Sequence, residues 1–158
     1  MLKLFPFGFL LMFLAAGCGQ RNMSDASLRA VKDSIIKLTN NTAKNITAKG
    51  PIGWLDEFEN SPDFYMANDG AIAFTDYPTA EKFIKGTLVK QLPHINLQFS
   101  QIRATVLSQE SGTVGAAFTE ELTDSTGKVT PISGYFTATA HHISTGWKYT
   151  NMHWSIKK

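Results

Sequence analysis

The chain has a single cysteine, and its charges show no bias toward one sign. Cys18 is the only cysteine among 158 residues, so no disulfide can form within one chain. The 15 Lys and Arg residues nearly balance the 13 Asp and Glu residues, and both kinds are scattered along the sequence. Without a basic stripe or block, the sequence has no electrostatic footprint for binding nucleic acid. It has none for charge-driven attachment to a membrane surface either.

Motifs of common catalytic and cofactor sites are also missing. The sequence contains no P-loop, no G-x-S-x-G elbow and no G-x-G-x-x-G fingerprint. His141 and His142 are adjacent, but neighbours along a strand point to opposite faces and cannot chelate one metal ion together. With one cysteine and four histidines, the spacing patterns of zinc sites are missing as well. We therefore expect no metal site and no cofactor.

The N-terminal residues 1–17 have the layout of an export signal. Lys3 supplies one positive charge, and an apolar run from Leu4 to Leu14 follows it. The run is too short to span a bilayer as a helix, which needs about 20 apolar residues. Small residues then lead directly to the single cysteine, in the string LAAGC at residues 14–18.

This string resembles the lipobox of bacterial lipoproteins. The resemblance implies that Cys18 becomes the mature N-terminus and carries diacylglycerol on its sulfur, with a further acyl group such as palmitate on its amine. Two or three acyl chains give a stable membrane anchor, whereas one chain does not. By the same resemblance, Gly19 in place of Asp favours the outer membrane, with the domain facing the periplasm. The alternative is an ordinary signal peptide with a cysteine nearby by chance.

The resulting organisation is simple. Residues 1–17 form the predicted signal peptide, residues 18–23 the lipidated cysteine and a short tether, and residues 24–158 one folded domain. A domain of this length buries about two-thirds of its unfolded surface, so it can build a hydrophobic core without disulfides or metals.

Helical patterns are clear in the first half of this domain. Ser24 is a suitable N-cap for a helix that extends to about residue 48, since apolar residues recur along it at helical spacing. The stretch WLDEFEN (54–60) favours a second, short helix. A third helix is predicted over residues 78–92, with Asp76 as its cap.

The remaining segments favour strands. Asn68-Asp69-Gly70 is a turn sequence between two short apolar runs and predicts a β-hairpin. Four longer strands follow, separated by turn-rich gaps, and their sequential order predicts an antiparallel meander. They fit residues 95–107, 113–123, 129–142 and 147–156. The fold class is therefore α+β, with the helices packed on one face of a long curved antiparallel sheet.

This order of elements resembles the NTF2-like superfamily and its SnoaL-like domains. The closing stretch GWKYTNMHWS resembles the ending common in those domains, at Gly146, Trp147, Lys148, Tyr149, His153 and Ser155. Asn151 stands where many members carry a second His, which weakens any transfer of a His-pair function. The resemblance implies a cone-shaped fold that spans nearly the whole mature chain. It does not decide function, because the superfamily includes both enzymes and non-catalytic binders.

Regular alternation along the strands predicts what the cone contains. It places Tyr149, Asn151 and His153 on one face of the last strand, and the resemblance implies that this face is the concave one. It also places Glu120 among apolar neighbours. A carboxylate in such surroundings must find partners or raise its pKa. The predicted ligand pocket is a largely aromatic chamber with a few polar groups. Its residues are Phe58, Tyr65, Phe83, Phe99, Phe118, Glu120, Phe136, Tyr149, Asn151 and His153.

The same alternation places Met152, Trp154 and Ile156 on the outer face of the last strand. An exposed apolar patch of this kind often marks an interface. Members of the resembling superfamily commonly pair through this face of the sheet. The sequence therefore predicts a homodimer through these three side chains.

Two functional hypotheses follow from these observations. The first is a lipid-anchored, non-catalytic binder of a small apolar or amphipathic molecule or of a partner at the cell envelope. It is favoured because no catalytic set can be assembled from the sequence. The alternative is a SnoaL-like isomerase or hydrolase in which Glu120 and His153 act as acid and base.

Overall fold

The computed structural model describes residues 23–158, and its first element is a long helix. Helix α1 (Asp25–Lys49) begins at the predicted cap, where the Ser24 hydroxyl accepts a hydrogen bond from the Ser27 amide at 3.2 Å. One face of α1 is buried, including Ile35 and Ile46 with no exposed surface. The helix ends at Gly50, whose φ of 64° suits glycine.

The prediction of a short helix over residues 54–60 is wrong. A 3₁₀ helix, η1 (Gly50–Trp54), precedes this stretch, and an irregular turn follows it. Here the backbone bonds to the sheet: Tyr149 donates to the Glu57 carbonyl at 2.8 Å, and Glu59 donates to the Tyr149 carbonyl at 2.9 Å. Backbone groups committed to a strand in this way are not free to build a helix.

The predicted hairpin is confirmed. Strands β1 (Tyr65–Asn68) and β2 (Ala71–Phe74) pair antiparallel across a two-residue turn. Asp69 and Gly70 have φ values of 47° and 84°, the left-handed conformation that such tight turns require.

The third predicted helix is confirmed with one irregularity. Helix α2 (Tyr77–Phe83) begins at Asp76, whose carboxylate accepts a hydrogen bond from the Thr79 amide at 2.7 Å. The chain continues through a π-helical segment, η2 (Ile84–Leu88), into the short helix α3 (Val89–Gln91). A π-helical turn is uncommon and often occurs at functional sites.

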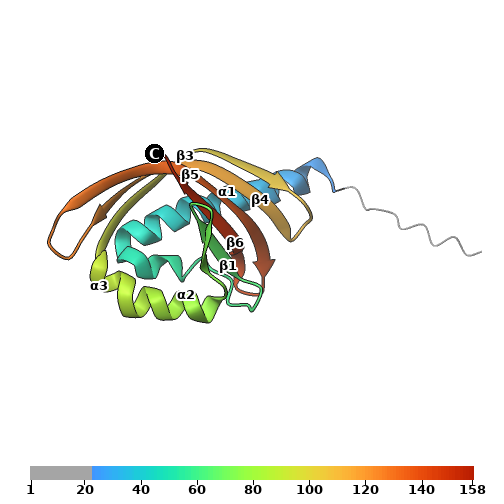
Figure 1. The fold of residues 1–158 in the computed structure, drawn as a ribbon. Helices are drawn as coiled ribbons and strands as arrows, with labels where there is room; N and C mark the ends of the chain where they lie inside the picture. The colour runs from blue at the N-terminus through green and yellow to red at the C-terminus, as the bar shows by residue number, and fades with distance from the viewer. Residues whose placement is uncertain (1–22) are drawn as a thin grey trace, which may run out of the picture.

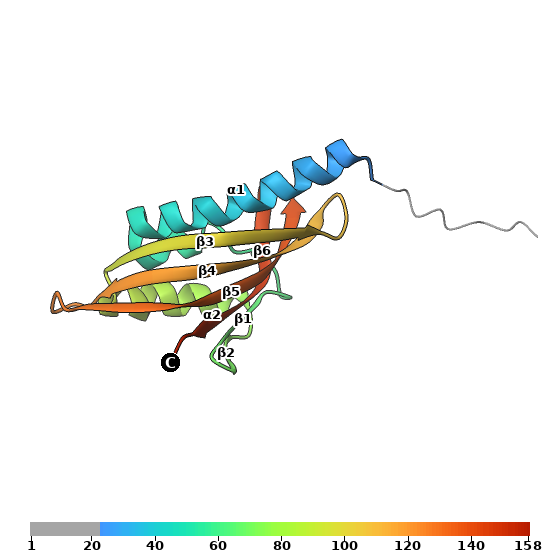
Figure 2. The same cartoon turned by 90° about the horizontal axis from the view of Figure 1, so that it is seen from above.

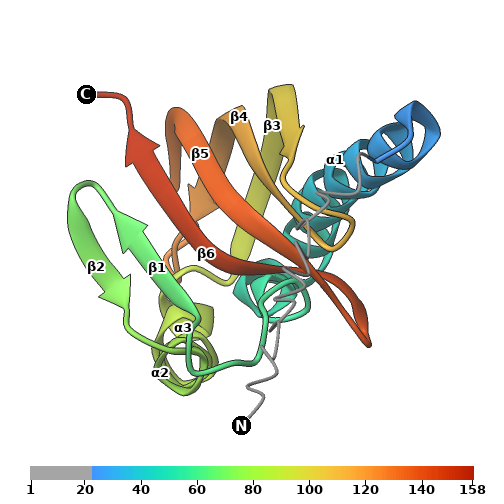
Figure 3. The ribbon, with the colours of Figure 1, turned by 90° about the vertical axis from the view of Figure 1, so that its right-hand side faces the viewer.

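Four long strands form most of the sheet, and the predicted antiparallel meander is confirmed. They are β3 (His94–Val106), β4 (Ser111–Thr123), β5 (Val129–Ile143) and β6 (Gly146–Ile156). The strand order is β2-β1-β6-β5-β4-β3, and only β1 and β6 pair in parallel. The sheet curls over the helices, with the α2–α3 helix lying across the open side of the curve (Figures 1 and 3).

Helix α1 covers the edge of the sheet formed by β3. It runs alongside β3 in the view from above (Figure 2), and the Leu97 amide donates to the Thr47 hydroxyl at 3.1 Å. A covered edge cannot pair with another chain. The structure is thus an α+β domain with its helices on the concave side of a curved sheet, as the sequence predicted.

Two β-bulges in the long strands β3 and β6 change the side-chain direction, and a third irregularity lies in the β1–β2 hairpin. In β6, Asn151 pairs with Thr139 while Tyr149 pairs with Ala140, so Thr150 is an extra residue. A second irregularity lies in β3 between Ser100 and Arg103. One inserted residue turns every following side chain to the opposite face.

The β6 bulge overturns the predicted orientation of the final strand. After Thr150, His153 pairs with Thr137 and points outward, whereas Trp154 pairs with Phe136 and points inward. Trp154 is only 5% exposed. The expectation that Asn151 and His153 lie on the concave face is therefore wrong.

Trp154 is the centre of the aromatic core. Its ring centroid lies 4.7 Å from that of Phe136 and 4.9 Å from that of Phe118, and its indole stacks on Trp54 at 5.5 Å. Phe99 also contacts it, at 5.8 Å between centroids. These side chains pack against one another and fill the middle of the concave side of the sheet.

Candidate functional site

An apolar cavity of about 320 Å³ lies between the α2–α3 helix and the concave face of the sheet. Three aromatic side chains, Trp54, Phe74 and Phe83, contribute to its wall. The aliphatic part comes from the helix and from the ends of the long strands, at Met66, Ala73, Leu88, Leu92, Ile95, Leu122, Ile132 and Ile156. The two polar residues of the wall are Asn68 and Glu120. Small-molecule sites have this composition: an apolar lining with a few polar groups.

Glu120 is the only ionisable side chain in this wall. Strand β4 positions it between Leu97 on β3 and Ile132 on β5, and it is 6% exposed. Its Oε1 atom is buried and has no hydrogen-bond partner. Burial in these apolar surroundings raises the pKa of the Glu120 carboxyl from 4.5 to about 7. The expectation that Glu120 lies among apolar side chains inside the cone is confirmed.

A carboxyl group with this pKa has useful chemistry. Near neutral pH it is present in both forms, so it can donate a hydrogen bond as the acid or accept one as the carboxylate. It could also exchange a proton with a bound molecule. Its neighbours in the wall are almost all apolar, so a ligand would be the main hydrogen-bond partner.

The structure divides the ten predicted pocket residues into three groups. Only Phe83 and Glu120 line the cavity. Five others, Phe58, Phe99, Phe118, Phe136 and Tyr149, belong to the packed core. Tyr65, Asn151 and His153 lie on the outer face of the sheet. The predicted aromatic chamber is therefore a solid aromatic core, because the rings fill the space that they were expected to enclose.

Tyr149 shows why these core residues are unavailable to a ligand. Its side chain has no exposed surface, and its hydroxyl donates a hydrogen bond to the Thr39 hydroxyl of α1 at 3.0 Å. Burial raises the pKa of this phenol well above its ordinary value of 10. Tyr149 thus fastens the sheet to α1 and has no free polar group.

His153 and Glu120 lie on opposite sides of the sheet. His153 faces a broad outer hollow of about 600 Å³ that it shares with Tyr65, Arg103 and Tyr135, whereas Glu120 faces the cavity. Two groups separated by a sheet cannot transfer protons to and from one substrate atom. The prediction that Glu120 and His153 act together as acid and base is therefore wrong.

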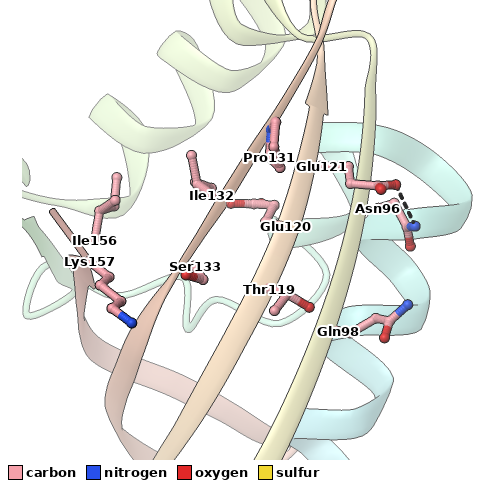
Figure 4. Close-up of a pocket in the computed structure, with 10 residues that line it drawn as sticks. All are labelled: Asn96, Gln98, Thr119, Glu120, Glu121, Pro131, Ile132, Ser133, Ile156 and Lys157. Atoms are coloured by element: carbon pink, nitrogen blue, oxygen red, sulfur yellow. Dashed lines mark hydrogen bonds between the residues drawn. The ribbon is translucent and has the colours of Figure 1, made fainter.

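A second hollow of about 410 Å³ lies along the distal ends of the same strands, and Figure 4 shows its lining. Its side chains are mainly polar, including Gln98, Thr119 and Ser133, and Asn96 donates a hydrogen bond to Glu121 at 3.1 Å. Glu120 and Glu121 point in opposite directions from β4 (Figure 4). Glu120, Ile132 and Ile156 line this hollow as well as the cavity. Since the rest of the hollow is mainly polar, the apolar cavity is the better candidate site for an apolar molecule.

The residues predicted to form a dimer interface are not on the outer face. Met152 and Trp154 are 3% and 5% exposed, and Ile156 lines the cavity. The β6 bulge turns these side chains inward, so they cannot form that interface.

Two kinds of feature are missing from residues 23–158, a metal-binding cluster and a membrane-spanning helix. No three His, Cys, Asp or Glu side chains in this part of the chain are placed to hold a metal ion together. No helix within the same range is both long and apolar enough to cross a membrane. The predicted signal peptide and Cys18 lie outside the described residues.

Solved structures with the same arrangement of helices and strands are numerous. An NTF2-like superfamily protein from Salmonella enterica superposes with a TM-score of 0.70, over 82% of this chain and 93% of that one, at 18% identity. The chain has the NTF2-like fold. This confirms the expectation drawn from its sequence.

Other solved structures with this fold include an enzyme and a protein described as uncharacterized. Hexachlorocyclohexane dehydrochlorinase LinA-type3 from Novosphingobium barchaimii superposes with a TM-score of 0.67, over 85% of this chain and 92% of that one, at 10% identity. An uncharacterized protein with a cystatin-like fold from Caulobacter vibrioides gives 0.62, over 80% and 89%, at 15% identity. No sequence profile of a known family matches the chain, and neither does any curated protein. These likenesses establish the fold alone.

Proposed function

We propose that this protein is a lipid-anchored envelope protein whose NTF2-like domain binds a small, mainly apolar molecule in the cavity beside Glu120, without transforming it. The observation that carries the proposal is the cavity itself, an apolar space of about 320 Å³ with a buried carboxyl in its wall. An apolar molecule placed there would gain free energy by leaving water. The carboxyl would fix its orientation.

Lipid attachment is the second part of the proposal. It is supported by the string LAAGC at residues 14–18, in which Cys18 is the acceptor. Cys18→Ser removes the acyl acceptor. When an ordinary cleavable signal peptide replaces residues 1–17, this variant should move from the membrane fraction to the soluble envelope fraction. Mass spectrometry of the wild-type protein should find acyl chains on its N-terminal cysteine. Membrane attachment that survives Cys18→Ser would contradict this part of the proposal.

A neutral fluorescent probe tests the binding function. We expect N-phenyl-1-naphthylamine to brighten when it is added to the full-length protein carrying Cys18→Ser, which needs no detergent. Replacing Ala73 with Trp should fill the rim of the cavity and abolish the signal. The matched control is Ile72→Trp, since Ile72 is 59% exposed on the same strand and does not line the cavity. Binding that Ala73→Trp leaves unchanged would show that the probe sits elsewhere.

One observation favours a second candidate function, an enzyme that uses Glu120 alone. A buried carboxyl with a pKa of about 7 suits general acid or base catalysis near neutral pH. The dehydrochlorinase among the structural neighbours shows that this fold can support catalysis. If a substrate is found, Glu120→Gln should abolish turnover while substrate still binds. Unchanged turnover would eliminate this candidate.

Dimer formation stays a prediction, and any interface would have to use other residues. The outer face of the sheet is the available surface, with Tyr65 and Tyr135 at 43% and 44% exposure. Equilibrium sedimentation at tens of micromolar decides the question. A dimer that Tyr135→Lys dissociates would locate the interface on this face, and a monomer at all concentrations would reject the prediction.

A further inference from the structure

The buried polar atoms that lack hydrogen bonds are concentrated around the cavity. In residues 23–158 they are Trp54 Nε1, Asn68 Oδ1, Glu120 Oε1 and Trp154 Nε1. Three of these four residues line the cavity, and the fourth, Trp154, stacks on Trp54 with an angle of 2° between the ring planes. A buried polar atom without a partner is costly, so folded proteins rarely leave one unpaired. Their concentration at one cavity indicates that a bound molecule completes their hydrogen bonding.

The kinds of atom in this set restrict what that molecule can carry. The indole N–H of Trp54 can only donate, the Asn68 Oδ1 atom can only accept, and the Glu120 carboxyl does either according to its protonation. A hydroxyl group both donates and accepts, so one hydroxyl can bond with any of these atoms. An ether oxygen has no proton to donate to Asn68 Oδ1, and a hydrocarbon can form a hydrogen bond with none of the three atoms.

The absence of basic side chains from the cavity wall also restricts the charge of the bound molecule. No Lys, Arg or His lines the cavity, so an anionic ligand would find no counter-charge and would be repelled by ionised Glu120. A cation could pair with Glu120, but it would leave the Trp54 N–H without an acceptor. A neutral ligand therefore matches the polar atoms better than either kind of ion.

The apolar part of the wall favours a flat molecule. Phe74 and Phe83 lie 5.6 Å apart between ring centroids and form one aromatic corner, and Trp54 supplies a further aromatic surface. Aromatic side chains contact ring systems through stacked and edge-to-face arrangements.

We infer that the cavity takes a small, neutral ring compound that carries a hydroxyl group, which hydrogen-bonds with the polar atoms of Trp54, Asn68 and Glu120. This inference rests on the proposed binding function and adds the chemical class of the ligand. It explains why an otherwise apolar wall contains three residues, Trp54, Asn68 and Glu120, each with a buried polar atom that has no hydrogen-bond partner.

Four probes that share one ring system test this inference on the full-length protein carrying Cys18→Ser. They are naphthalene, 2-naphthol, 2-naphthylmethylamine and 2-naphthoate, and their dissociation constants are measured by quenching of tryptophan fluorescence. We expect 2-naphthol to bind about tenfold more tightly than naphthalene, which is the effect of roughly one satisfied buried hydrogen bond. The amine and the carboxylate should bind more weakly than 2-naphthol.

Variants then locate the hydroxyl. Glu120→Leu and Asn68→Leu keep the wall apolar, and each should reduce the preference for 2-naphthol over naphthalene several-fold. Glu120→Leu removes an unpaired buried polar group, so loss of folding is not a concern. The matched control is Glu121→Gln on the other side of β4, which should keep the full preference.

The outcomes separate the inference from the function on which it rests. Equal affinity for naphthalene and 2-naphthol would overturn the hydroxyl inference and leave apolar binding intact. Tightest binding of the amine or of the carboxylate would overturn it too, in favour of an ionic ligand. A preference that both Leu variants retain would show that the hydroxyl bonds elsewhere. If none of the four probes binds the wild-type protein, the proposed binding function itself fails.

Discussion

Replacement of Glu120 with Gln should change how the stability of the protein depends on pH. The side chain is 6% exposed, and burial raises the pKa of its carboxyl from 4.5 to about 7 in the folded state. Below pH 4.5 the carboxyl is protonated in both the folded and the unfolded chain. Between 4.5 and 7 the unfolded chain releases this proton while the folded chain keeps it, so the free energy of unfolding falls as pH rises. Above 7 the loss is complete.

The size of the effect follows from the same pKa values. At 1.36 kcal/mol for each pH unit, the interval from 4.5 to about 7 corresponds to a loss of about 3 kcal/mol. Glutamine does not ionise, so Glu120→Gln escapes this loss. The variant should therefore match the wild type near pH 4.5 and exceed its stability by about 3 kcal/mol above pH 7. For a domain of this size, that difference raises the melting temperature by roughly 10 °C.

The assay is thermal or urea unfolding of both proteins from pH 4 to 8. Other groups that titrate in this range, including Glu57, whose pKa burial also raises, contribute to both curves and cancel in the difference. Glu121→Gln is the control, since Glu121 is exposed on the next position of the same strand. A difference between Glu120→Gln and wild type that stays constant with pH would refute the reasoning, because Glu120 would then not be buried and unpaired.

Three further predictions concern the packing that defines the site, and each is measured as a urea midpoint at unchanged m-value. Trp154→Ala should lower the free energy of unfolding by about 3–5 kcal/mol, because it empties the centre of the aromatic core. His153→Ala should change it by no more than about 0.5 kcal/mol. If His153→Ala were the more destabilising of the two, the β6 bulge would have to lie elsewhere. Gly134→Ala should destabilise by about 1–3 kcal/mol, since its Cβ would collide with the Ser155 carbonyl oxygen. A neutral result would mean that β5 and β6 are farther apart. Tyr149→Phe should cost about 1 kcal/mol for its bond to Thr39, and no cost would show that the bond is absent in solution.

Local signals in the sequence predicted the boundaries of most elements. Ser24 and Asp76 are caps in the structure because their side chains accept hydrogen bonds from nearby backbone amides, which needs no distant partner. Asp69 and Gly70 form the expected turn because these residue types adopt positive φ at little cost. The meander of long strands followed from short turn-rich gaps.

The helix expected over residues 54–60 failed for the opposite reason. Its backbone bonds with Tyr149, a residue far along the chain, so local preference was overridden by a tertiary contact. The same contact lies beside the β6 bulge, where the Thr150 hydroxyl donates to Glu59 Oε2 at 2.8 Å. Both errors thus lie at one place in the fold, where residues 57–59 meet β6.

The sequence did contain a sign of the bulge. Tyr149, Met152, Trp154 and Ile156 are apolar, and their spacing changes phase once between 149 and 152. Regular alternation across this step assigned every later residue to the wrong face, while one phase change would have placed Trp154 inside and His153 outside. In β3 the apolar residues Phe99 and Ile102 show the same change of phase across the other bulge.

The location of the cavity was beyond local signals. Glu120 was identified because its own strand surrounds it with apolar residues, and strand alternation alone shows this. The rest of the wall comes from η1, β1, β2, the α2–α3 helix, β3, β5 and β6, which only the fold brings together. Whether aromatic side chains enclose a space or fill it depends on distances between elements, which a sequence does not specify.

The sequence by itself therefore determined the fold class, the order of the elements and a carboxyl group in apolar surroundings, because periodicity, caps and turns act over a few residues. The tertiary structure decided which face of β6 is buried, that the aromatic residues form a packed core, and that an apolar cavity lies beside Glu120. These features depend on how distant segments meet, and one inserted residue in a strand is enough to exchange the two faces.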